Sequence, residues 1–286
     1  MSAMGEHRAG FVAVGGRTNV GKSTLVNRIV GHKVAIVTPR PQTTRRRILG
    51  IRSDPDAQIL LIDTPGLHIA KKELNQRMVQ VARRALAEGE VILAVVEAGE
   101  RLNPGDRAVL VDIRALAHPT IVVINKIDRV ARALLLPVIE EISMGFPGAE
   151  IVPVSARSGE NFDELLSTIK RMLPLSPALM SPDEYTDQTE RMLAEEIVRE
   201  KVFLTMRQEI PFSTAVRVEN FEEDAERNLK KIRATVVVDR ESHKGMLIGA
   251  GGRTLKEIGT AARLELDRSE ERRVGKECRS RWSPYH

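Results

Sequence analysis

Eight residues near the start of the chain have the types and spacing needed to hold a chain of phosphates. Residues 16–23 read GRTNVGKS and fit the pattern G-x-x-x-x-G-K-[ST]. Gly16 and Gly21 let the backbone wrap around phosphates and point its N–H groups inward. Lys22 can reach the β- and γ-phosphates, and the Ser23 hydroxyl can bind Mg²⁺. The predicted nucleotide-contacting residues of this loop are Gly16, Arg17, Thr18, Asn19, Val20, Gly21, Lys22, Ser23 and Thr24.

A second motif indicates which nucleotide this loop would hold. Residues 125–128 read NKID and follow an apolar run, so they stand where a strand ends, the place at which open α/β sheets bind ligands. Asp128 can accept two hydrogen bonds from the N1–H and the exocyclic amine of guanine. Adenine offers no matching donors, and sites built in this way discriminate by about 10⁴-fold or more. We therefore predict a guanine nucleotide, with Asn125 bracing the loops, Lys126 covering the base and Ile127 completing the motif.

A third motif, DTPG at residues 63–66, also follows an apolar run. Asp63 would hold Mg²⁺ through water, and the Gly66 N–H would contact the γ-phosphate, with Thr64 and Pro65 between them. Two threonines lie in the segment that joins the phosphate-binding loop to this motif. A threonine hydroxyl there would complete the Mg²⁺ shell in the triphosphate state, and we favour Thr44 over Thr43. The predicted metal ligands are therefore Ser23, Thr44 and Asp63.

The last part of the predicted nucleotide site is Ser155-Ala156. These two residues end the apolar run Ile151-Val-Pro-Val154, so they too stand at the carboxyl end of a predicted strand. A backbone N–H at this point can meet O6 of guanine. All four motifs thus follow apolar runs, which predicts that their side chains gather along one edge of a sheet.

The elements that carry these motifs alternate along the chain. From Gly10 to about Leu173, apolar strands alternate with helical patterns, which predicts an α/β fold with a doubly wound, mostly parallel sheet. The next residues contain three prolines within nine positions and are typical of a linker. We place a nucleotide-binding domain at residues 1–173, a linker at 174–186, and a smaller α+β domain at 187–267.

The smaller domain carries a glycine-rich motif of its own. A long amphipathic helix at 189–206 and two strands at 213–219 and 232–238 precede it, and the acids of the helix favour packing on the strands over adsorption to anionic lipid. Residues 249–252 fit G-x-x-G between two short helices, as in a KH domain, where glycines let the backbone approach nucleic-acid phosphates. By itself G-x-x-G usually marks only a turn. The predicted RNA-binding residues are Lys244, Ile248, Gly249, Ala250, Gly251, Gly252, Arg253 and Lys256.

Taken together, the segments GRTNVGKSTLVN, PQTTRRRILGI, DTPGLHIAKKELNQRM, NKID, VPVSARSGEN and HKGMLIGAGGRTLKEIG resemble the Era family of GTPases over residues 8 to about 267. The resemblance implies a P-loop GTPase domain followed by a type II KH domain that binds single-stranded ribosomal RNA at the 3′ end of the small subunit and assists the assembly of that subunit. It implies a cytoplasmic protein with some peripheral association with the inner membrane face, and we expect a monomer. The family commonly has Lys where this chain has Ala250.

Two residues bear on hydrolysis. Leu67 stands where small signalling GTPases have the Gln that orients the attacking water, so the resemblance implies slow intrinsic turnover. Asn19 occupies a position at which related GTPases help to hold K⁺ against the phosphates, and we carry that role over as a hypothesis, the alternative being that Asn19 only shapes the loop. The predicted catalytic residues are Asn19, Lys22, Thr44 and Gly66, and the expected cofactors are Mg²⁺ and, by hypothesis, K⁺.

The last 19 residues, 268–286, read unlike the rest of the chain. They contain its one Cys and its one Trp, show no apolar periodicity, and match a translated sequencing adapter. We interpret them as a non-native tail, the alternative being a basic RNA-binding tail. They carry six Lys/Arg and three Asp/Glu, so the net charge of +5 falls to +2 without them. The tail begins where a last helix should lead to a third strand, so we expect an incomplete and frayed KH domain.

Composition narrows the remaining classes of function. Outside the tail there is no Cys, which excludes disulfide and thiol chemistry and fits a reducing compartment. No run of residues has the length of a membrane span, and the first ten residues do not form a signal peptide. Two alternatives stay open at this point: an RNA-binding module that uses GTP only as a ligand, and a membrane-associated regulatory GTPase.

Overall fold

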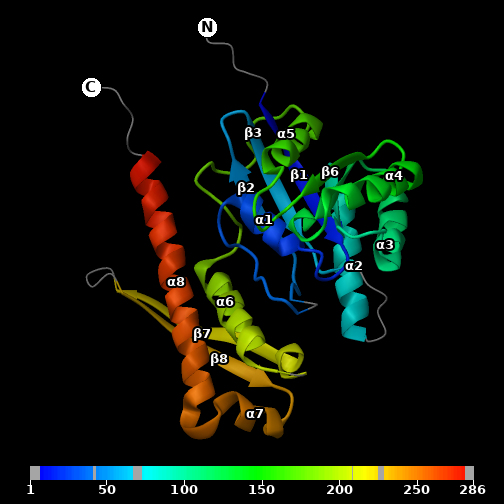
Figure 1. Ribbon diagram of the computed structural model, residues 1–286. Helices are drawn as coiled ribbons and strands as arrows, with labels where there is room; N and C mark the ends of the chain where they lie inside the picture. The colour runs from blue at the N-terminus through cyan, green and yellow to red at the C-terminus, as the bar shows by residue number, and fades with distance from the viewer. Residues whose placement is uncertain (1–6, 41–42, 67–72, 208, 225–228, 281–286) are drawn as a thin grey trace, which may run out of the picture. The chain divides into compact units, whose positions relative to one another are not determined.

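The computed structural model describes residues 7–40, 43–66, 73–207, 209–224 and 229–280 (Figure 1). The chain divides into two compact units, Met1–Asp187 and Gln188–His286. The predicted site residue Leu67 lies outside the described residues.

The first unit is built on a six-stranded sheet with the order β2-β3-β1-β4-β5-β6. Only β2 runs antiparallel, against β3, and the other neighbouring pairs are parallel. The strands are β1 (Arg8–Gly16), β2 (Ile48–Ser53), β3 (Ala57–Asp63), β4 (Val91–Glu97), β5 (Thr120–Asn125) and β6 (Glu150–Val154). The chain moves from β1 to one side of the sheet and then returns to place β4 on the other side, so β1 and β4 flank the point where ligands bind in such folds. The predicted α/β fold with a mostly parallel sheet is confirmed.

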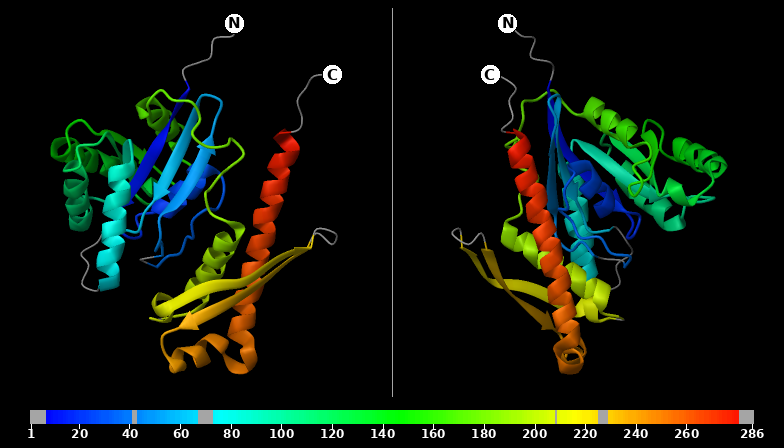
Figure 2. Two further views of the ribbon diagram at one scale, coloured as in Figure 1. Left: turned by 180° about the vertical axis from the view of Figure 1, so that it is seen from behind. Right: turned by 60° about the vertical axis from the view of Figure 1, so that its left-hand side comes forward.

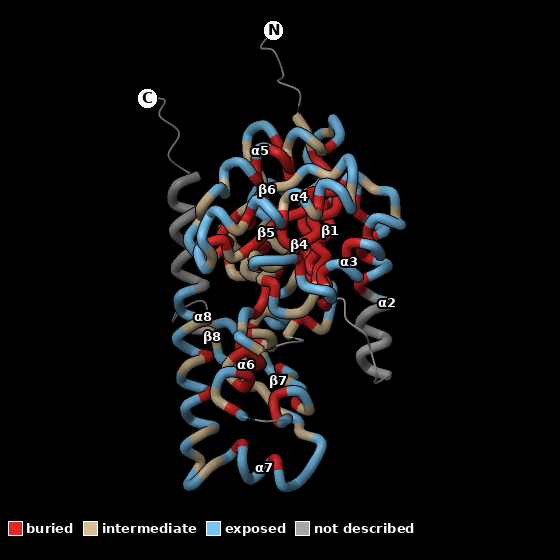
Figure 3. The backbone as a smooth tube through the Cα atoms, turned by 45° about the vertical axis from the view of Figure 1, so that its right-hand side comes forward, coloured by how far each residue is buried: buried red, intermediate tan, exposed pale blue. Residues whose placement is uncertain are grey.

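Helices cover both faces of this sheet (Figures 1 and 2). Alternate residues of the central strands point to opposite faces, so Val12 and Val14 join one core and Ala13 joins the other. The first core lies under α1 (Lys22–Val30) and α5 (Phe162–Met172). The second lies under α2 (Glu73–Glu88), α3 (Pro104–Arg114) and α4 (Leu135–Gly145). Figure 3 shows how strongly burial concentrates in the central strands, which therefore form a rigid base for the loops at their ends.

The segment predicted as a linker is packed along the first unit. The backbone N–H of Ile51 in β2 donates to Tyr185 O, and the Thr186 hydroxyl donates to Leu49 O. In β3, the fully buried Gln58 carboxamide accepts hydrogen bonds from the backbone N–H groups of residues 179 and 180. It also donates to Met180 O. The segment at 174–186 is therefore tied to β2 and β3 by a backbone–backbone hydrogen bond and by hydrogen bonds of the side chains of Thr186 and Gln58.

The second unit joins a hairpin to three helices. It comprises α6 (Glu190–Thr205), a 3₁₀ turn η3 (Ile210–Ser213), β7 (Thr214–Asp224), β8 (Leu229–Val238), α7 (Glu241–Ile248), a 3₁₀ turn η4 (Ala250–Gly252) and α8 (Arg253–Ser280). Thr189 caps α6 by accepting a hydrogen bond from the Met192 N–H. The helix packs on β7 and α8 (Figure 2), as the amphipathic pattern predicted. A small core of Val202, Met206, Ile210, Leu247 and Ile258 joins these elements.

Two features of this unit bear on the expected truncation. Its described residues form a sheet of two antiparallel strands, β7 and β8. The helix α8 continues through Ser280, beyond the boundary that we placed at Asp267, so residues 268–280 extend the helix. Fraying of this unit in solution stays a prediction. Among the described residues, no helix combines the length and the apolar character that crossing a membrane requires.

Candidate functional site

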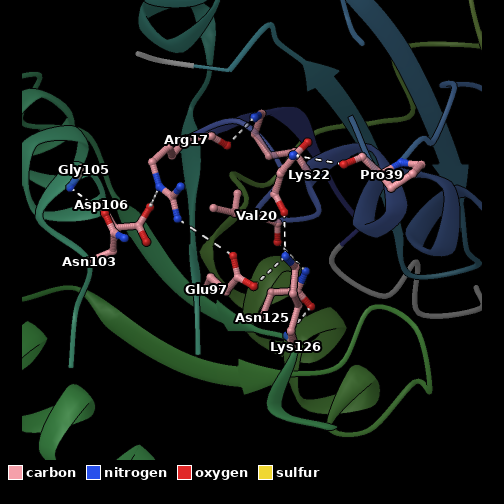
Figure 4. Close-up of polar contacts among 11 residues, drawn as sticks. Arg17, Val20, Lys22, Pro39, Glu97, Asn103, Gly105, Asp106, Asn125 and Lys126 are labelled. Carbon is pink, nitrogen blue, oxygen red and sulfur yellow. Dashed lines mark hydrogen bonds and ion pairs between the residues drawn. The ribbon is translucent and has the colours of Figure 1, made fainter. Parts of the chain in front are cut away.

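The predicted nucleotide motifs converge at the carboxyl ends of β1, β3, β5 and β6. Gly16 is the last residue of β1, Asp63 of β3 and Asn125 of β5, and Ser155 directly follows β6. These strands are neighbours in the sheet or separated by one strand, which places the four motifs along one edge. Figure 4 shows the side of this site at which the phosphate-binding loop meets residues 97, 106 and 125–126.

The phosphate-binding loop has the backbone that its glycines permit. Gly16 and Gly21 have φ angles of 148° and 99°, and a Cβ on Gly16 would lie 2.4 Å from Val95 O. A Cβ on Gly21 would lie 2.3 Å from Asn125 Nδ2. Asn19 also has a positive φ, of 67°, a conformation that Asn adopts more readily than most residues. Because Gly16 and Gly21 carry no side chain, the backbone of the loop can lie directly against neighbouring residues and against a ligand.

Lys22 is buried beneath this loop and bonded to its carbonyl groups. Its Nζ donates to Gly16 O at 3.1 Å and to Arg17 O at 3.0 Å. Burial lowers the pKa of Lys22 to about 8, against the opposing attraction of Asp63 and Asp106. A phosphate at the loop would add negative charge close to this ammonium group and favour its protonated form. The chain thus holds a cation where a triphosphate needs one.

Three oxygen-bearing side chains gather beside Lys22. The Ser23 hydroxyl donates to Asp63 Oδ2 at 2.8 Å and lies 3.0 Å from the Thr44 hydroxyl. Asp63 is fully buried, and burial raises the pKa of its carboxyl group. Its other oxygen, Oδ1, makes no hydrogen bond within the described part of the chain. An unsatisfied carboxylate oxygen beside two hydroxyls is a set of hard donors that fits Mg²⁺.

The structure brings Thr44, and not Thr43, to this cluster. Thr44 is buried at Ser23, whereas the Thr43 hydroxyl donates to Arg40 O at 3.3 Å. Gly66 lies against the phosphate-binding loop, because a Cβ there would approach Thr18 Cγ2 to 2.6 Å. The Thr64 hydroxyl is buried and donates to Val14 O at 2.8 Å, which anchors the DTPG turn to β1.

Asn125 braces three loops, as we predicted from the sequence. Its Nδ2 donates to Val20 O at 2.8 Å, and its Oδ1 accepts the N–H groups of Lys126 at 2.8 Å and Ala156 at 2.9 Å. The side chain is only 2% exposed. The Asn125 carboxamide therefore connects the phosphate-binding loop to the two loops predicted to contact the base, those at residues 125–128 and 155–156; we call the latter two the base-side loops.

Asp128 is exposed and its carboxylate is held at one oxygen. The Ser155 hydroxyl donates to Asp128 Oδ1 at 2.7 Å, and this hydrogen bond lowers the pKa of Asp128. The group is therefore ionised at neutral pH, as recognition of the two guanine donors requires. The neighbouring Ile127 is buried in the core of the first unit.

The backbone N–H groups of Ser155 and Ala156 differ from our expectation. We expected one of them to face O6 of guanine, but the Ser155 N–H donates to Glu160 O at 3.1 Å and the Ala156 N–H donates to Asn125. The residues lie at the predicted place, yet both donors are already used inside the protein. Ser155 instead acts through its hydroxyl, which orients Asp128.

Lys126 and Asn19 meet through a backbone carbonyl. Lys126 has a positive φ of 70°, and its Nζ donates to Asn19 O at 2.7 Å. The Asn19 side chain turns to the segment that leads to Thr44, donating from Nδ2 to Pro39 O at 3.2 Å. The remaining predicted contact residues, Arg17, Val20, Thr24 and Pro65, belong to the same loops or to the first turn of α1.

Three residues of the site escaped the reading of the sequence. Arg28 in α1 donates to Ala156 O at 2.6 Å and to Arg157 O at 2.5 Å, which fixes the base-side loop to the helix of the phosphate-binding loop. Glu97 accepts from Lys126, and the buried Asp106 accepts from Arg17. The sequence offers no motif for any of them, since each contact joins segments far apart along the chain.

The glycine-rich loop of the second unit is an exposed turn between two helices. Gly249, Gly251 and Gly252 all have positive φ angles, and a Cβ on Gly249 would lie 2.2 Å from Thr254 Oγ1. Ala250 is exposed, as are Lys244, Arg253 and Lys256. Ile248 is 39% exposed. The structure thus places all the predicted RNA-binding residues around one turn.

Exposed apolar side chains accompany this loop. Met246 and Leu255 are 49% and 43% exposed, and neither was singled out from the sequence. Lys244 forms an ion pair with Glu241 at 3.1 Å. Apolar side chains beside cations and a glycine-rich backbone form a surface on which unstacked bases and phosphates can both find contacts.

Comparisons with known proteins agree with both units. The family described as 50S ribosome-binding GTPase matches residues 11–126, and a KH domain family matches residues 209–281. The chain is 44% identical over 261 residues to GTPase Era of Syntrophus aciditrophicus, covering 91% of this chain and 85% of that protein. It is likewise 44% identical to GTPase Era of Geobacter metallireducens, with 91% and 88% covered.

Two solved structures are similar over the same span. One is a variant of Aquifex aeolicus Era bound to GDP and aluminium fluoride, and the other is Era in complex with MgGDPNP and nucleotides 1506–1542 of 16S ribosomal RNA. Each is 43% identical with a TM-score of 0.87, covering 91% of this chain and 89% of its own. With its GTPase motifs at one sheet edge and a KH domain after them, the chain belongs to the Era family of GTPases, whose members hydrolyse GTP.

Proposed function

We propose that this GTPase is a nucleotide-controlled switch that binds the 3′ end of small-subunit ribosomal RNA and assists the assembly of that subunit. One observation carries the proposal: a single chain joins the Ser23–Asp63–Thr44 cluster to an exposed G-x-x-G turn. The first senses a triphosphate and the second accepts single-stranded RNA. A similar protein, Era in complex with MgGDPNP and a 16S ribosomal RNA fragment, supports both ligands.

Ser23, Asp63 and Thr44 would hold Mg²⁺ in this proposal. The ion supplies positive charge that neutralises the β- and γ-phosphate oxygens. The chain's own groups do the rest of the binding. Lys22 places its ammonium beneath the phosphates, and the loop from Gly16 to Gly21 surrounds them. Gly66, whose backbone lies against Thr18, would offer its N–H to the γ-phosphate.

The nucleotide state would be read by Thr44 and Gly66. Both lie beside the phosphate-binding loop but belong to separate segments, one before β2 and the other after β3. A γ-phosphate that both contact would hold these segments together, and hydrolysis would release them. We propose that this change alters RNA binding by the second domain, and that hydrolysis ends the association.

Asn19 is proposed as a ligand of K⁺ during slow hydrolysis. Its amide bridges the phosphate-binding loop to Pro39, so it lies between the two segments that would enclose the triphosphate. An added cation would supply charge that other GTPases obtain from an arginine. Hydrolysis by the full chain should be faster in K⁺ than in Na⁺ at equal ionic strength. Equal rates would remove this role from Asn19.

The RNA side of the proposal depends on the turn at residues 249–252. Lys244, Arg253 and Lys256 would neutralise phosphates, while Ile248 lies exposed beside them. We propose that the protein acts as a monomer in the cytoplasm, where ribosomal subunits are assembled.

The deciding experiment measures binding of a labelled 3′-terminal small-subunit ribosomal RNA fragment to the full chain. It is run with a GTP analogue, with GDP, and with Ala250→Asp and Ala250→Asn variants. We expect tight binding only with the analogue, lost in Ala250→Asp because its carboxylate repels phosphate, and retained in the uncharged Ala250→Asn of matched size. Equal binding in both nucleotide states would remove the switch, and equal binding by both variants would remove this turn as the RNA site.

A further inference from the structure

Glu97 is a charged residue at the nucleotide site that no motif predicted. It is the last residue of β4 and pairs in register with Asn125 of β5. Its Oε1 accepts a hydrogen bond of 2.7 Å from Lys126 Nζ (Figure 4). The same Nζ also donates to Asn19 O. Two acceptors on different segments therefore fix the end of the Lys126 side chain.

A second ion pair holds Glu97 from the other side. Arg17 of the phosphate-binding loop places its guanidinium 3.9 Å from Glu97 Oε2, and its Nε donates to Asp106 Oδ1 at 3.1 Å. Asp106 is fully buried in the first turn of α3. A Cβ on the neighbouring Gly105 would lie 2.8 Å from Arg17 Cδ, so the arginine stem packs against this turn.

The four side chains form a row of alternating charge: Lys126, Glu97, Arg17, Asp106. We propose that Glu97 is a positioning residue for the guanine base, that it holds Lys126 in the orientation that covers the base before the nucleotide binds, and that the Arg17–Asp106 pair keeps Glu97 in place. This inference rests on the proposed role of Lys126 at the base. We call this row the charge relay of residues 17, 97, 106 and 126.

Preorganisation is the physical reason for such a relay. A free lysine side chain loses rotamer freedom when it is fixed over a base, and this loss weakens binding. The hydrogen bond to Glu97 already restricts the Lys126 side chain in the folded protein. Nucleotide binding therefore causes little further loss of side-chain entropy. The same carboxylate would repel the phosphates if it stood alone, and Arg17 cancels that charge. The benefit concerns the base side, so it should be equal for GDP and GTP.

The relay therefore predicts a pattern across variants of the full chain. Glu97→Gln should raise Kd for GDP and for a GTP analogue by the same factor, about 3- to 10-fold, the range for a partly exposed charged hydrogen bond. KM for GTP should rise by a similar factor while kcat changes less than about twofold, because the γ-phosphate site is untouched. Glu97→Asp, which keeps the charge, should recover part of the affinity.

Arg17→Met tests the second ion pair of Glu97. It should weaken binding of both nucleotides by leaving the Glu97 charge uncancelled. Combining it with Glu97→Gln should cost less than the two single changes added together, since they remove one shared interaction. The matched control is Glu150→Gln, which breaks an exposed pair with Arg171 elsewhere in the same unit and should leave Kd unchanged.

The experiment titrates labelled GDP, GTP analogue and xanthine nucleotide into these proteins and into Asp128→Asn, with thermal unfolding to verify folding. Asp128→Asn should change the base preference from guanine to xanthine. This variant independently tests the assignment of Asp128 to the base. If that exchange occurs and Glu97→Gln binds both guanine nucleotides within twofold of the unaltered protein, the relay is refuted while the base site stands. If Asp128→Asn leaves the preference unchanged, the base assignment fails and the relay fails with it. A strictly additive Arg17→Met/Glu97→Gln pair would also overturn the relay. Should Glu97→Gln alone fold poorly, Glu97→Ala replaces it in the same comparison with Arg17→Met.

Discussion

Ser23 Oγ and Asp63 Oδ2 are joined by a hydrogen bond of 2.8 Å, although the two residues stand forty positions apart in the sequence. The bond links the first turn of α1 to the end of β3, the two elements that carry the phosphate-binding loop and the DTPG turn. It also satisfies one oxygen of a carboxylate whose other oxygen makes no hydrogen bond within the described residues. The cluster is thus assembled in the folded chain, and Asp63 Oδ1 is left to coordinate a metal ion.

The first prediction concerns this pair. Ser23→Ala removes a proposed metal ligand, so nucleotide affinity in Mg²⁺ should fall by about tenfold or more. Affinity in EDTA should change by less than about twofold, because the loop backbone and Lys22 are unaltered. Ser23→Thr keeps the hydroxyl and should bind nearly as well as the unaltered protein. Fluorescent-nucleotide titration with and without chelator measures both quantities; an equal loss in both buffers would contradict the metal role.

The second prediction concerns Asn125, which makes three hydrogen bonds to three loops. Asn125→Ala leaves buried backbone groups unsatisfied and should lower the free energy of unfolding by about 2–4 kcal/mol. Nucleotide affinity should fall by about tenfold or more, since the base-side and phosphate-side loops lose their common tie. Urea unfolding and nucleotide titration on the same samples give the two numbers.

Asn27 supplies the matched control for that variant. Its side chain also makes three hydrogen bonds to the backbone, accepting from the N–H groups of Val34 and Ala35 and donating to Ala35 O. Asn27→Ala should lose comparable stability but much less nucleotide affinity, because its partners follow α1 and do not belong to the base-side loops. A comparable affinity loss in both variants would show that Asn125 acts only through stability.

The third prediction concerns stability in acid. The pKa of Asp54 lies below its ordinary value of 3.8 because hydrogen bonds from Arg52 and Lys170 outweigh the opposing effect of burial. The unfolded chain therefore takes up a proton first as pH falls. The stabilisation is complete above about pH 4 and is lost as pH falls through the folded-state pKa.

Lys170→Met tests this relationship. It should lower the free energy of unfolding by about 1 kcal/mol at pH 7, and the loss of stability between pH 5 and pH 3 should become shallower. Urea midpoints measured across that range give the slope. Arg132→Gln breaks the exposed pair with Glu160 in the same unit and should leave both the midpoint and the slope unchanged. An unaltered acid slope in Lys170→Met would exclude this lysine as the cause.

The fourth prediction concerns the G-x-x-G turn. Ala250 is exposed between Gly249 and Gly251 in this turn. Ala250→Lys should add one phosphate contact, tighten RNA binding at low salt and steepen the dependence of affinity on salt by about one counterion. Filter binding at several salt concentrations measures the slope. Tighter binding with an unchanged slope would mean that the lysine contacts something other than phosphate.

The nucleotide motifs were predictable because each is short and its spacing is fixed by the phosphate chain or by the base. Thr44, which we favoured over Thr43, is the threonine that lies at Ser23, whereas the Thr43 hydroxyl donates to Arg40 O. The role of Thr44 as a Mg²⁺ ligand stays a prediction. Glu97, Asp106 and Arg28 could not be predicted, because their contacts depend on which strand ends lie side by side. The hydrogen bond from the Ala156 N–H to Asn125 Oδ1 could not be predicted for the same reason.

The smaller unit was predictable in its order of elements but not in all its lengths. The strands run from Thr214 and Leu229, longer than the alternating patterns at 213–219 and 232–238 indicated. Hairpin pairing extends strands beyond their apolar residues, because backbone groups pair whatever side chains they carry. The long α8 likewise continues past the last apolar position on which the prediction depended.

The backbone ties between β2, Gln58 and residues 174–186 decide where the GTPase unit can be cut for separate production. A chain ended at Leu173 would strip the partners from Ile51 N–H and leave the buried Gln58 carboxamide without those at residues 179 and 180. It would also uncover the outer edge of β2, and bare strand edges promote aggregation. Expression of the isolated unit should therefore extend to Asp187, and the shorter version should be markedly less soluble.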